Sequence, residues 1–326
     1  MQQNNQEPCA NPCNLCGSND VSVLATLSRT GKPLRSVICN HCGLVWSDPF
    51  PHNLRSFYAD DYRVAYKGTF TPKPKHILRA GKVALSRRKI LADLLAKPLK
   101  ILDVGTGGGE FAYLLQSLSH EVNGIEPNKG YAEFSRQEYG LNVQVGFIQD
   151  IDQPDQSFDL ITIWHVLEHT ENPYVVLTKL HALLKPQGIL VVEVPTIEAT
   201  CQSPKSTFHE AHVFNFNIDT LQKLGEKVGF TVQKHEVSPD GANITVFFQK
   251  STAVTPSLQE NDLKIPGNAK KIIDIVKNHT AGKHYLTAEP YRRFFCRMSR
   301  VINESIATAN FTSGKQLLDR LYKPFC

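Results

Sequence analysis

The chain has 326 residues, 41% of them hydrophobic and 21% charged, and its formal net charge is +5. No apolar run is long enough to span a membrane, and the first residues lack the basic and apolar parts of a signal peptide, so we expect a cytoplasmic protein. Residues 251–326 hold 12 Lys and Arg against 6 Asp and Glu, which leaves the first 250 residues nearly neutral. A neutral body argues against a nucleic-acid partner.

Four cysteines near the N-terminus form two Cys-x-x-Cys pairs, and a glycine follows each pair. The four are Cys13, Cys16, Cys39 and Cys42. Two such pairs offer the four thiolates of a closed, structural zinc site, and we predict a zinc ribbon over residues 1–50. Disulfides are the alternative, which a reducing cytosol disfavours. We interpret His41 as a turn residue and Cys9 as a free thiol.

Residues 51–98 are expected to be a linker and a lead-in helix. Prolines, lysines and glycine between residues 67 and 75 predict a loop. The apolar spacing from Ile77 to Leu95 predicts a helix that leads into the first strand of a sheet.

A short apolar run then meets a glycine-rich turn. Residues 100–104 predict a strand, the glycines of residues 105–109 a tight turn, and the apolar spacing that follows a helix. Such a turn lets the backbone approach a ligand beside the free N–H groups of a helix start. The dinucleotide fingerprint Gly-x-Gly-x-x-Gly is not met, because Glu110 holds its last position. Asp103 and Glu110 would repel a pyrophosphate and suit a cationic ligand.

This stretch, with its Asp-x-Gly-x-Gly spacing, resembles the class I S-adenosylmethionine-dependent methyltransferases over residues 95–250. The resemblance implies a doubly wound, mostly parallel seven-stranded α/β sheet of the Rossmann-like kind over residues 99–250. It also implies S-adenosyl-L-methionine as cofactor. The residues that it places against the methionine part of the cofactor are Asp103, Gly105, Thr106 and Gly107.

The ribbon and the aromatic segment that follows it resemble the N-terminal module of the sugar C-methyltransferase subgroup. In that subgroup the aromatic pair leads into a linker over the cofactor cleft, so the resemblance implies that Tyr62 touches the cofactor. Packing of this aromatic segment in the core is the alternative.

Alternating strand and helix patterns support the parallel sheet. Predicted strands lie near 100–104, 121–126, 142–147, 158–163, 188–194, 230–237 and 243–249. Predicted helices lie near 109–118, 129–139, 172–184 and 218–228.

Glu126 ends the second of these strands, 21 positions after Gly105. A carboxylate at that place can accept hydrogen bonds from both ribose hydroxyls of a nucleoside, which makes Glu126 our candidate for ribose binding. A solvated acid is the alternative. Pro127 would stiffen the turn against the adenine.

The resemblance implies contacts to the cofactor for two further segments. Phe147 stands where many relatives place an Asp against the adenine, so Phe147 and Ile148 are expected to hold the base by stacking and backbone groups. At the tip of the fourth strand, the backbone of Trp164 and His165 is expected to meet the methionine end of the cofactor.

Residues 207–216 place two histidines, one glutamate and three aromatic residues within ten positions. They resemble the His-Glu-His segment of the sugar C-methyltransferases, with Ala211 inserted before the second histidine. Because histidine needs little tuning to act as a base near neutral pH, we assign His212, His209 and Glu210 to catalysis or acceptor binding, with His212 preferred. The alternatives are histidines that satisfy backbone groups in a buried loop, and a metal held by His209 and His212.

Residues 251–326 are predicted to be a basic helical extension, with helices from Ala269 to Asn278, Pro290 to Ala309 and Gly314 to Tyr322. Arginines and aromatic residues alternate from Tyr291 to Arg297. Three roles suit that segment: a lid for a phosphate-bearing acceptor, an amphipathic helix against an anionic membrane or a partner, or a helix with a solvated basic face.

The sequence therefore predicts methyl transfer from S-adenosyl-L-methionine to a carbon or oxygen of a small molecule. A nucleotide-linked or lipid-linked sugar and another secondary metabolite are the acceptor classes considered. An RNA methyltransferase with a zinc module and a non-catalytic, cofactor-binding assembly protein are the alternatives. The sequence does not predict the oligomeric state.

Overall fold

The computed structural model describes residues 9–51, 55, 72–251, 260–308 and 311–325. The chain divides into two compact units. Unit 1 consists of Met1–His52, His165–His181 and Val192–Pro290, and unit 2 of Asn53–Trp164, Ala182–Val191 and Tyr291–Cys326. The limits of these two units differ from those of the four domains expected from the sequence. The limits of the four domains stay a prediction.

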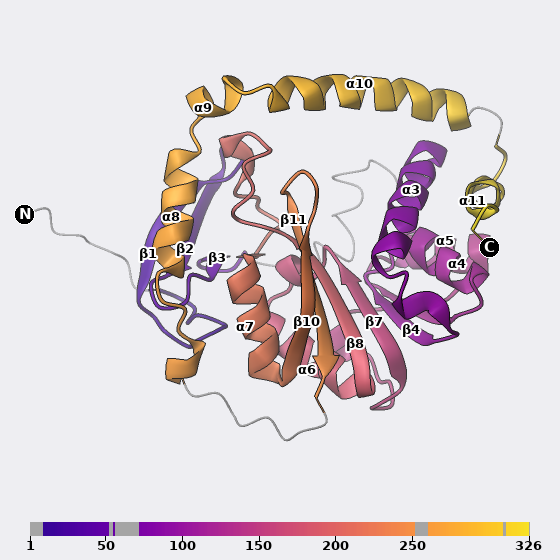
Figure 1. Ribbon diagram of the computed structural model, residues 1–326, viewed down its shortest axis with the longest axis horizontal. Helices are drawn as coiled ribbons and strands as arrows, with labels where there is room; N and C mark the ends of the chain where they lie inside the picture. The colour runs from indigo at the N-terminus through magenta and orange to yellow at the C-terminus, as the bar shows by residue number, and fades with distance from the viewer. Residues whose placement is uncertain (1–8, 52–54, 56–71, 252–259, 309–310, 326) are drawn as a thin grey trace, which may run out of the picture. The chain divides into compact units, whose positions relative to one another are not determined.

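A seven-stranded sheet has the strand order β10-β11-β8-β7-β4-β5-β6 (Figure 1). In chain order the strands are β4 (Lys100–Val104), β5 (Glu121–Glu126), β6 (Asn142–Val145), β7 (Phe158–Trp164), β8 (Leu184–Pro195), β10 (Phe230–Val237) and β11 (Asn243–Lys250). Strand β4 pairs in parallel with β5 and β7, and β5 with β6, whereas β10 and β11 are antiparallel. The predicted α/β fold with a mostly parallel, seven-stranded sheet is confirmed.

Helices alternate with these strands as the apolar spacing predicted. They are α3 (Pro74–Ile90), α4 (Glu110–Ser117), α5 (Lys129–Tyr139), α6 (Pro173–Leu183) and α7 (Ile218–Val228). Helix α7 begins with a reciprocal capping box between Asn217 and Thr220 and ends at Gly229, whose φ of 107° reverses the chain. Helix α3 ends at Ile90, earlier than predicted, because a separate tight turn, the 3-10 helix Leu94–Ala96, follows it.

The ribbon in unit 1 is a four-stranded antiparallel sheet with the order β1-β2-β3-β9. Its strands are β1 (Val21–Leu27), β2 (Pro33–Cys39), β3 (Val45–Ser47) and β9 (Phe214–Asn215). Strand β9 comes from the histidine-rich stretch predicted to face the acceptor. The ribbon therefore holds one end of that stretch in place through backbone hydrogen bonds.

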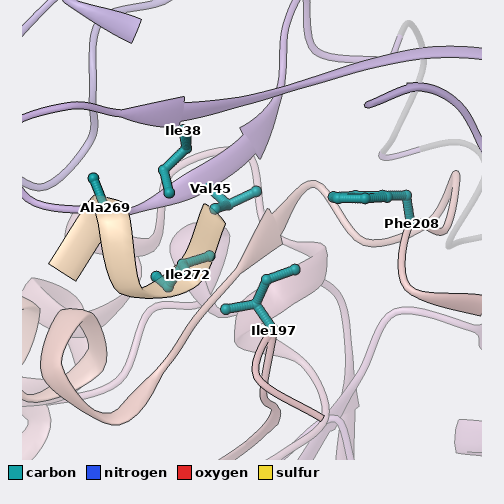
Figure 2. Packing of buried hydrophobic residues seen from close by; sticks show 6 residues of the cluster. All are labelled: Ile38, Val45, Ile197, Phe208, Ala269 and Ile272. Carbon is teal, nitrogen blue, oxygen red and sulfur yellow. The ribbon is translucent and has the colours of Figure 1, made fainter. Parts of the chain in front are cut away.

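A buried apolar cluster joins the ribbon to a C-terminal helix within unit 1. Ile38 of β2 and Val45 of β3 pack with Ile272 of α8 (Asn268–Asn278), and Ile197 and Phe208 complete the contact (Figure 2). Removing such side chains from water is the main source of folding free energy. The ribbon is thus built into unit 1 by its apolar face.

The remaining C-terminal helices are α9 (Ala281–Tyr285), α10 (Glu289–Thr308) and α11 (Gly314–Tyr322). The three predicted helices of this extension are confirmed, while α9 is a single short turn that the apolar spacing did not reveal. Within unit 2, α11 packs on α3, and the Tyr322 hydroxyl donates to the Glu110 carbonyl of α4 at 2.9 Å. Among the described helices, none combines the length and apolar character needed to cross a bilayer.

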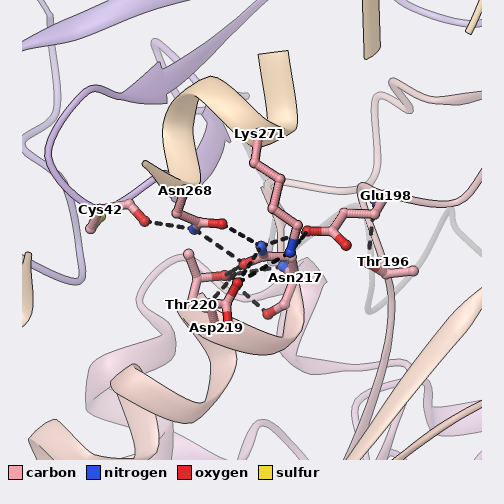
Figure 3. Close-up of polar contacts among 8 residues, drawn as sticks. All are labelled: Cys42, Thr196, Glu198, Asn217, Asp219, Thr220, Asn268 and Lys271. Carbon is pink, nitrogen blue, oxygen red and sulfur yellow. Dashed lines mark hydrogen bonds and ion pairs between the residues drawn. The ribbon is translucent and has the colours of Figure 1, made fainter. Parts of the chain in front are cut away.

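Polar side chains lock the second cysteine loop to two helix starts in unit 1. Asn268, at the start of α8, donates to the Cys42 carbonyl at 2.8 Å, and Asn217, at the start of α7, donates to Asn268 Oδ1 at 2.7 Å (Figure 3). Both amides are buried. The neighbouring Gly43 has a φ of 83°, and a Cβ on it would lie 2.5 Å from Asn268 Nδ2, so this contact requires glycine.

Replacing Asn268 by alanine is expected to lower the free energy of unfolding by about 2 kcal/mol, because it removes two buried hydrogen bonds and leaves the Cys42 carbonyl without this donor. Urea denaturation of Asn268→Ala measures this change. The exposed Asn278, at the other end of the same helix, is the matched control, and Asn278→Ala should cost less than about 0.5 kcal/mol. Equal effects of the two substitutions would contradict the structural role of the network.

Candidate functional site

In unit 2, the glycine turn after β4 is tied to the end of β5. The backbone N–H groups of Gly105 and Thr106 both donate to the Ile125 carbonyl, at 2.8 and 3.0 Å. Gly105 and Gly107 have φ values of 75° and 61°, which side chains other than glycine rarely adopt. The turn is therefore tied to β5 by its backbone and takes a conformation that favours glycine.

Glu126 lies beside this turn at the end of β5. One carboxylate oxygen accepts a hydrogen bond from the Gly107 N–H at 2.8 Å, and the other accepts one from the Asn128 N–H at 3.1 Å. A carboxylate has about four acceptor positions, and these two backbone donors use one on each oxygen. The structure thus brings the predicted ribose-binding acid and the predicted glycine turn together, and Pro127 follows directly in the chain.

Asp103, at the C-terminal part of β4, is buried and accepts a hydrogen bond from the Thr162 hydroxyl at 2.7 Å. Burial, with a smaller contribution from the charge of Glu126, raises the pKa of Asp103 to about 6 against the opposing effects of Thr162 and Arg87. Two acids beside the glycine turn make this part of unit 2 favourable for a positive charge.

Arg87 of α3 is a residue that the sequence analysis missed. Its guanidinium carbon lies 4.6 Å from the Trp164 ring centroid and 5.8 Å from that of Phe111. Phe111 and Trp164 meet edge to face, with centroids 5.7 Å apart. The cation and two aromatic rings thus surround the end of β7, and the only signal in the sequence was an arginine in the last turn of the lead-in helix.

The predicted adenine-side residues follow β6 in unit 2. Ile148 is buried, and the Phe147 ring lies 5.2 Å from the guanidinium carbon of Arg55. Arg55 also pairs with Asp150, at 2.9 and 3.2 Å. Tyr62, the other residue expected near the cofactor, lies outside the described residues.

Unit 1 contains a cluster of histidines and acids that begins with the residue after β7. His165 has a φ of 56°, and its ring lies between two carboxylates, 3.5 Å from Glu168 and 3.2 Å from Glu193. Burial alone would lower the pKa of His165, but the two carboxylates outweigh it and raise the pKa to about 9. His165 is therefore cationic at neutral pH, a role for its side chain that the sequence did not reveal.

Glu168 is almost fully buried, and neither of its carboxylate oxygens has a hydrogen-bond partner. Burial raises its pKa, yet the neighbouring histidines, His169 first among them, lower it to about 2. His169 Nδ1 lies 2.7 Å from the Ala211 carbonyl, so Nδ1 carries a proton there, and Nε2 faces Glu168 at 3.7 Å. The ionised form of Glu168 is thus stabilised by the neighbouring histidines, with the cationic His165 among them.

The two histidines predicted from the acceptor-facing stretch lie in the same cluster. Their rings stack with centroids 4.8 Å apart, and the His212 ring also meets the His169 ring at 5.0 Å. Burial, reinforced by the charge of His169, lowers the pKa of His212 to about 3. Burial likewise lowers the pKa of His209 to about 4, with help from Arg29. Both rings are neutral at pH 7.

The three predicted catalytic residues have different surroundings. His209 Nδ1 accepts the Ala211 N–H at 2.8 Å, so its remaining nitrogen is a donor. Glu210 accepts hydrogen bonds from the hydroxyls of Ser28, at 2.7 Å, and of Thr30, both in the ribbon. The local geometry therefore turns Glu210 toward the ribbon and favours His212 over His209 as a proton acceptor.

The four cysteines of the two pairs meet as predicted. All four are buried, their sulfur atoms lie within 4.8 Å of one another, and the Cys13–Cys42 and Cys16–Cys39 distances are 3.5 and 3.4 Å. The Lys227 ammonium donates to the Asn14 and Leu15 carbonyls of the first loop, at 3.1 and 2.8 Å, and interacts electrostatically with the thiols. A cation at this place offsets the negative charge of a four-thiolate zinc site, so the residues fit that metal.

Within the part of the chain that the structure describes, one other group could share an ion. It consists of Glu168, His169 and His212, whose ligand atoms lie within 4.8 Å of one another. The pair considered in the sequence analysis as an alternative metal site, His209 and His212, is not that group.

Comparison with known proteins shows which family part of the chain resembles. Residues 76–235 match a family model described as a methyltransferase domain. The chain carries a methyltransferase domain. The prediction of a methyltransferase, which was drawn from the glycine turn, is confirmed for this domain. The matched residues of the methyltransferase domain include the glycine turn, Glu126 and the cluster from His165 to His212.

Relatives of the methyltransferase domain are similar over part of their length. A ubiquinone biosynthesis O-methyltransferase of Actinobacillus pleuropneumoniae is 32% identical over 128 residues, which cover 36% of this chain and 53% of the relative. One of Coxiella burnetii is 28% identical over 123 residues, covering 36% and 51%. The chain thus spans about half the length of these relatives.

Among solved structures, the 1,6-didemethyltoxoflavin-N1-methyltransferase of Burkholderia thailandensis was crystallised with bound 1,6-didemethyltoxoflavin and S-adenosylhomocysteine. It is similar to 64% of this chain and 96% of its own, with 18% identity and a TM-score of 0.46.

Proposed function

We propose that this protein transfers the methyl group of S-adenosyl-L-methionine to a carbon or oxygen of a small molecule. The observation that carries the proposal is the buried carboxylate of Glu126, which is hydrogen-bonded to Gly107 inside the glycine turn, at the end of the strand where a ribose-binding acid is expected. The ribose hydroxyls of the cofactor supply two donors, and a phosphate supplies none.

The charge beside the turn also suits this cofactor. Burial disfavours the ionised form of Asp103, and a cationic ligand restores it, because an opposite charge at short range favours ionisation. The sulfonium and ammonium groups of S-adenosyl-L-methionine are such charges. In this proposal Gly105, Thr106 and Gly107 contact the methionine part, while Phe147, Ile148 and Pro127 hold the adenine.

At the C-terminal end of β7, a residue assigned to the cofactor is followed directly in the chain by the first residue of the histidine cluster. Trp164, the last residue of β7, belongs to the cofactor-binding unit, and His165 begins the histidine cluster. We assign their backbone to the methionine end of the cofactor. The cationic His165 ring, held by two carboxylates, keeps this turn in its left-handed conformation.

His212 is the proposed base. Methyl transfer to oxygen or carbon requires the acceptor to lose a proton, and an enzyme contributes chiefly by holding the acceptor in line with the methyl group. The His212 ring is neutral, so it can accept a proton, but its lowered pKa makes it a weak base.

The relatives narrow the acceptor class. Two of them are named as O-methyltransferases of ubiquinone biosynthesis, and by that likeness we favour an oxygen acceptor with an acidic hydroxyl group. Sugars carrying a nucleotide or a lipid remain the other proposed class. In either case the acceptor is a small molecule, as the neutral body indicates.

We also propose that Cys13, Cys16, Cys39 and Cys42 hold a structural zinc ion. Four thiolates close the tetrahedral coordination of zinc and leave no open position for a substrate. The ion would fix the two loops that the Asn217–Asn268 pair and Lys227 already contact.

The assay for the proposed activity is transfer of a labelled methyl group from S-adenosyl-L-methionine into a small-molecule extract. His212→Ala should reduce the rate by about 100-fold or more, as expected for loss of a general base. His235→Ala, an exposed histidine of β10, is the matched control and should leave the rate unchanged. No labelled product with the wild-type protein, or equal rates for the two variants, would contradict the proposal.

The pH dependence gives a second readout. Because the pKa of His212 is lowered to about 3, the neutral, active ring persists above that pH and is lost only below it. We therefore expect kcat/KM to show no acidic limb from this group between about pH 8 and pH 5. An acidic limb with an apparent pKa near 6.5, the ordinary histidine value, would show that another histidine is the base.

A further inference from the structure

The N-terminal half of α10 presents large apolar side chains to solvent. Tyr291, Phe294, Phe295 and Met298 are 55%, 59%, 69% and 51% exposed. Their spacing of three and four residues places them on one face of the helix. Soluble proteins rarely expose so many large apolar side chains together, so this face calls for an apolar environment.

The orientation of α10 explains why this face is exposed. Glu304, on the same helix, is buried and binds Arg79 of α3 within unit 2, at 3.1 and 2.5 Å. At about 100° per residue, Glu304 lies on the side opposite Phe295. The helix therefore turns the side that carries Glu304 toward α3 of unit 2 and the side that carries Phe295 to solvent, the reverse of an ordinary surface helix.

Arginines accompany the apolar face. Arg292, Arg293, Arg297 and Arg300 lie in the same ten residues, and the sequence has no acid between Pro290 and Asn303. By helical spacing, Arg292 and Arg297 flank the apolar face on its two sides. Long cationic side chains beside an apolar face reach lipid headgroups while their stems stay in the apolar layer.

We propose that residues 291–300 of α10 bind the surface of an anionic membrane, with the apolar face among the acyl chains and the arginines at the headgroups. Aromatic residues on one side and arginines on the other are the pattern of helices that lie in the membrane interface. A second copy of this chain fits less well, because joining two apolar faces would bring the flanking arginines of both copies together. The charge of the helix instead complements acidic lipids.

Vesicle sedimentation tests the proposal with the full-length, zinc-replete protein. The wild type should bind vesicles of phosphatidylcholine with about one quarter phosphatidylglycerol, and bind pure phosphatidylcholine much more weakly. Phe294→Ser/Phe295→Ser should weaken binding to the mixed vesicles by about 100-fold. Arg292→Gln/Arg297→Gln should weaken it by about 30-fold and remove much of the preference for the acidic lipid.

Val145→Ser/Val175→Ser is the matched control, since these valines are 38% and 45% exposed on other elements. It should bind vesicles like the wild type. Methyl transfer to a soluble acceptor, measured in parallel, should be the same for all four proteins, which separates this proposal from the proposed activity. No binding to the mixed vesicles, or no loss of binding in the phenylalanine variant, would overturn it. A concentration-dependent dimer that the phenylalanine variant abolishes, without vesicle binding, would assign the face to a second copy and overturn it too.

Discussion

Replacing Glu126 by alanine is expected to weaken the binding of S-adenosylhomocysteine by at least about 100-fold, because two hydrogen bonds from the ribose to a charged acceptor are lost. The same substitution removes the partners of the Gly107 and Asn128 N–H groups, so the glycine turn also loosens. Isothermal titration calorimetry of Glu126→Ala against the wild type measures the change in affinity.

Two comparisons make this result specific to the proposed ribose site. Glu121, at the exposed start of the same strand, pairs with Lys100 on the surface, and Glu121→Ala should bind the cofactor product like the wild type. Glu126→Gln keeps the size of the side chain but points an NH2 group at one of the two backbone donors, so it should bind weakly as well. If Glu126→Gln or Glu126→Ala bound S-adenosylhomocysteine with wild-type affinity, Glu126 would not be the residue that binds the ribose.

Loss of one zinc-site cysteine should have the largest effect on stability. Cys39→Ser is expected to reduce the zinc content from one ion per chain to nearly none and to lower the melting temperature by about 10 °C or more, because binding a structural zinc ion contributes directly to folding. The effect should extend through unit 1, since the Cys42 loop is bonded to the starts of α7 and α8. Metal analysis and thermal unfolding measure the two quantities.

Cys9 supplies the control for the zinc prediction. It is close to the ribbon in sequence, but its thiol contacts the Asn11 carbonyl and lies outside the four-cysteine group. Cys9→Ser should keep the zinc and the melting temperature. If Cys39→Ser retained a full complement of zinc, the four-thiolate site would be wrong.

The fold could be predicted from the sequence because its signals are local. The glycine turn, the apolar periods and the turn residues predicted β4, β5 and β10 with the bounds that the structure shows. The four cysteines were predictable as one group for a similar reason, because the spacing within each pair fixes the geometry of a metal loop.

The candidate site was only partly predictable because its pairings join residues far apart in the chain. Nothing near His165 in the sequence indicates that Glu193 will face its ring, and nothing distinguishes Arg87 from its basic neighbours Arg88 and Lys89 as the residue that contacts Trp164. The link from Asn268 to Cys42 crosses most of the chain. Hydrophobic periodicity specifies which face of an element is buried, whereas the partner on that face is decided by packing.

The central claim is that the glycine turn and Glu126 bind a cationic sulfur nucleoside. Isothermal titration calorimetry of the purified, zinc-replete protein with S-adenosylhomocysteine, NAD and ATP in separate experiments tests it most directly. We predict saturable binding of S-adenosylhomocysteine at one site per chain and none of the two phosphate-bearing nucleotides. Binding of NAD or ATP without binding of S-adenosylhomocysteine would contradict the claim.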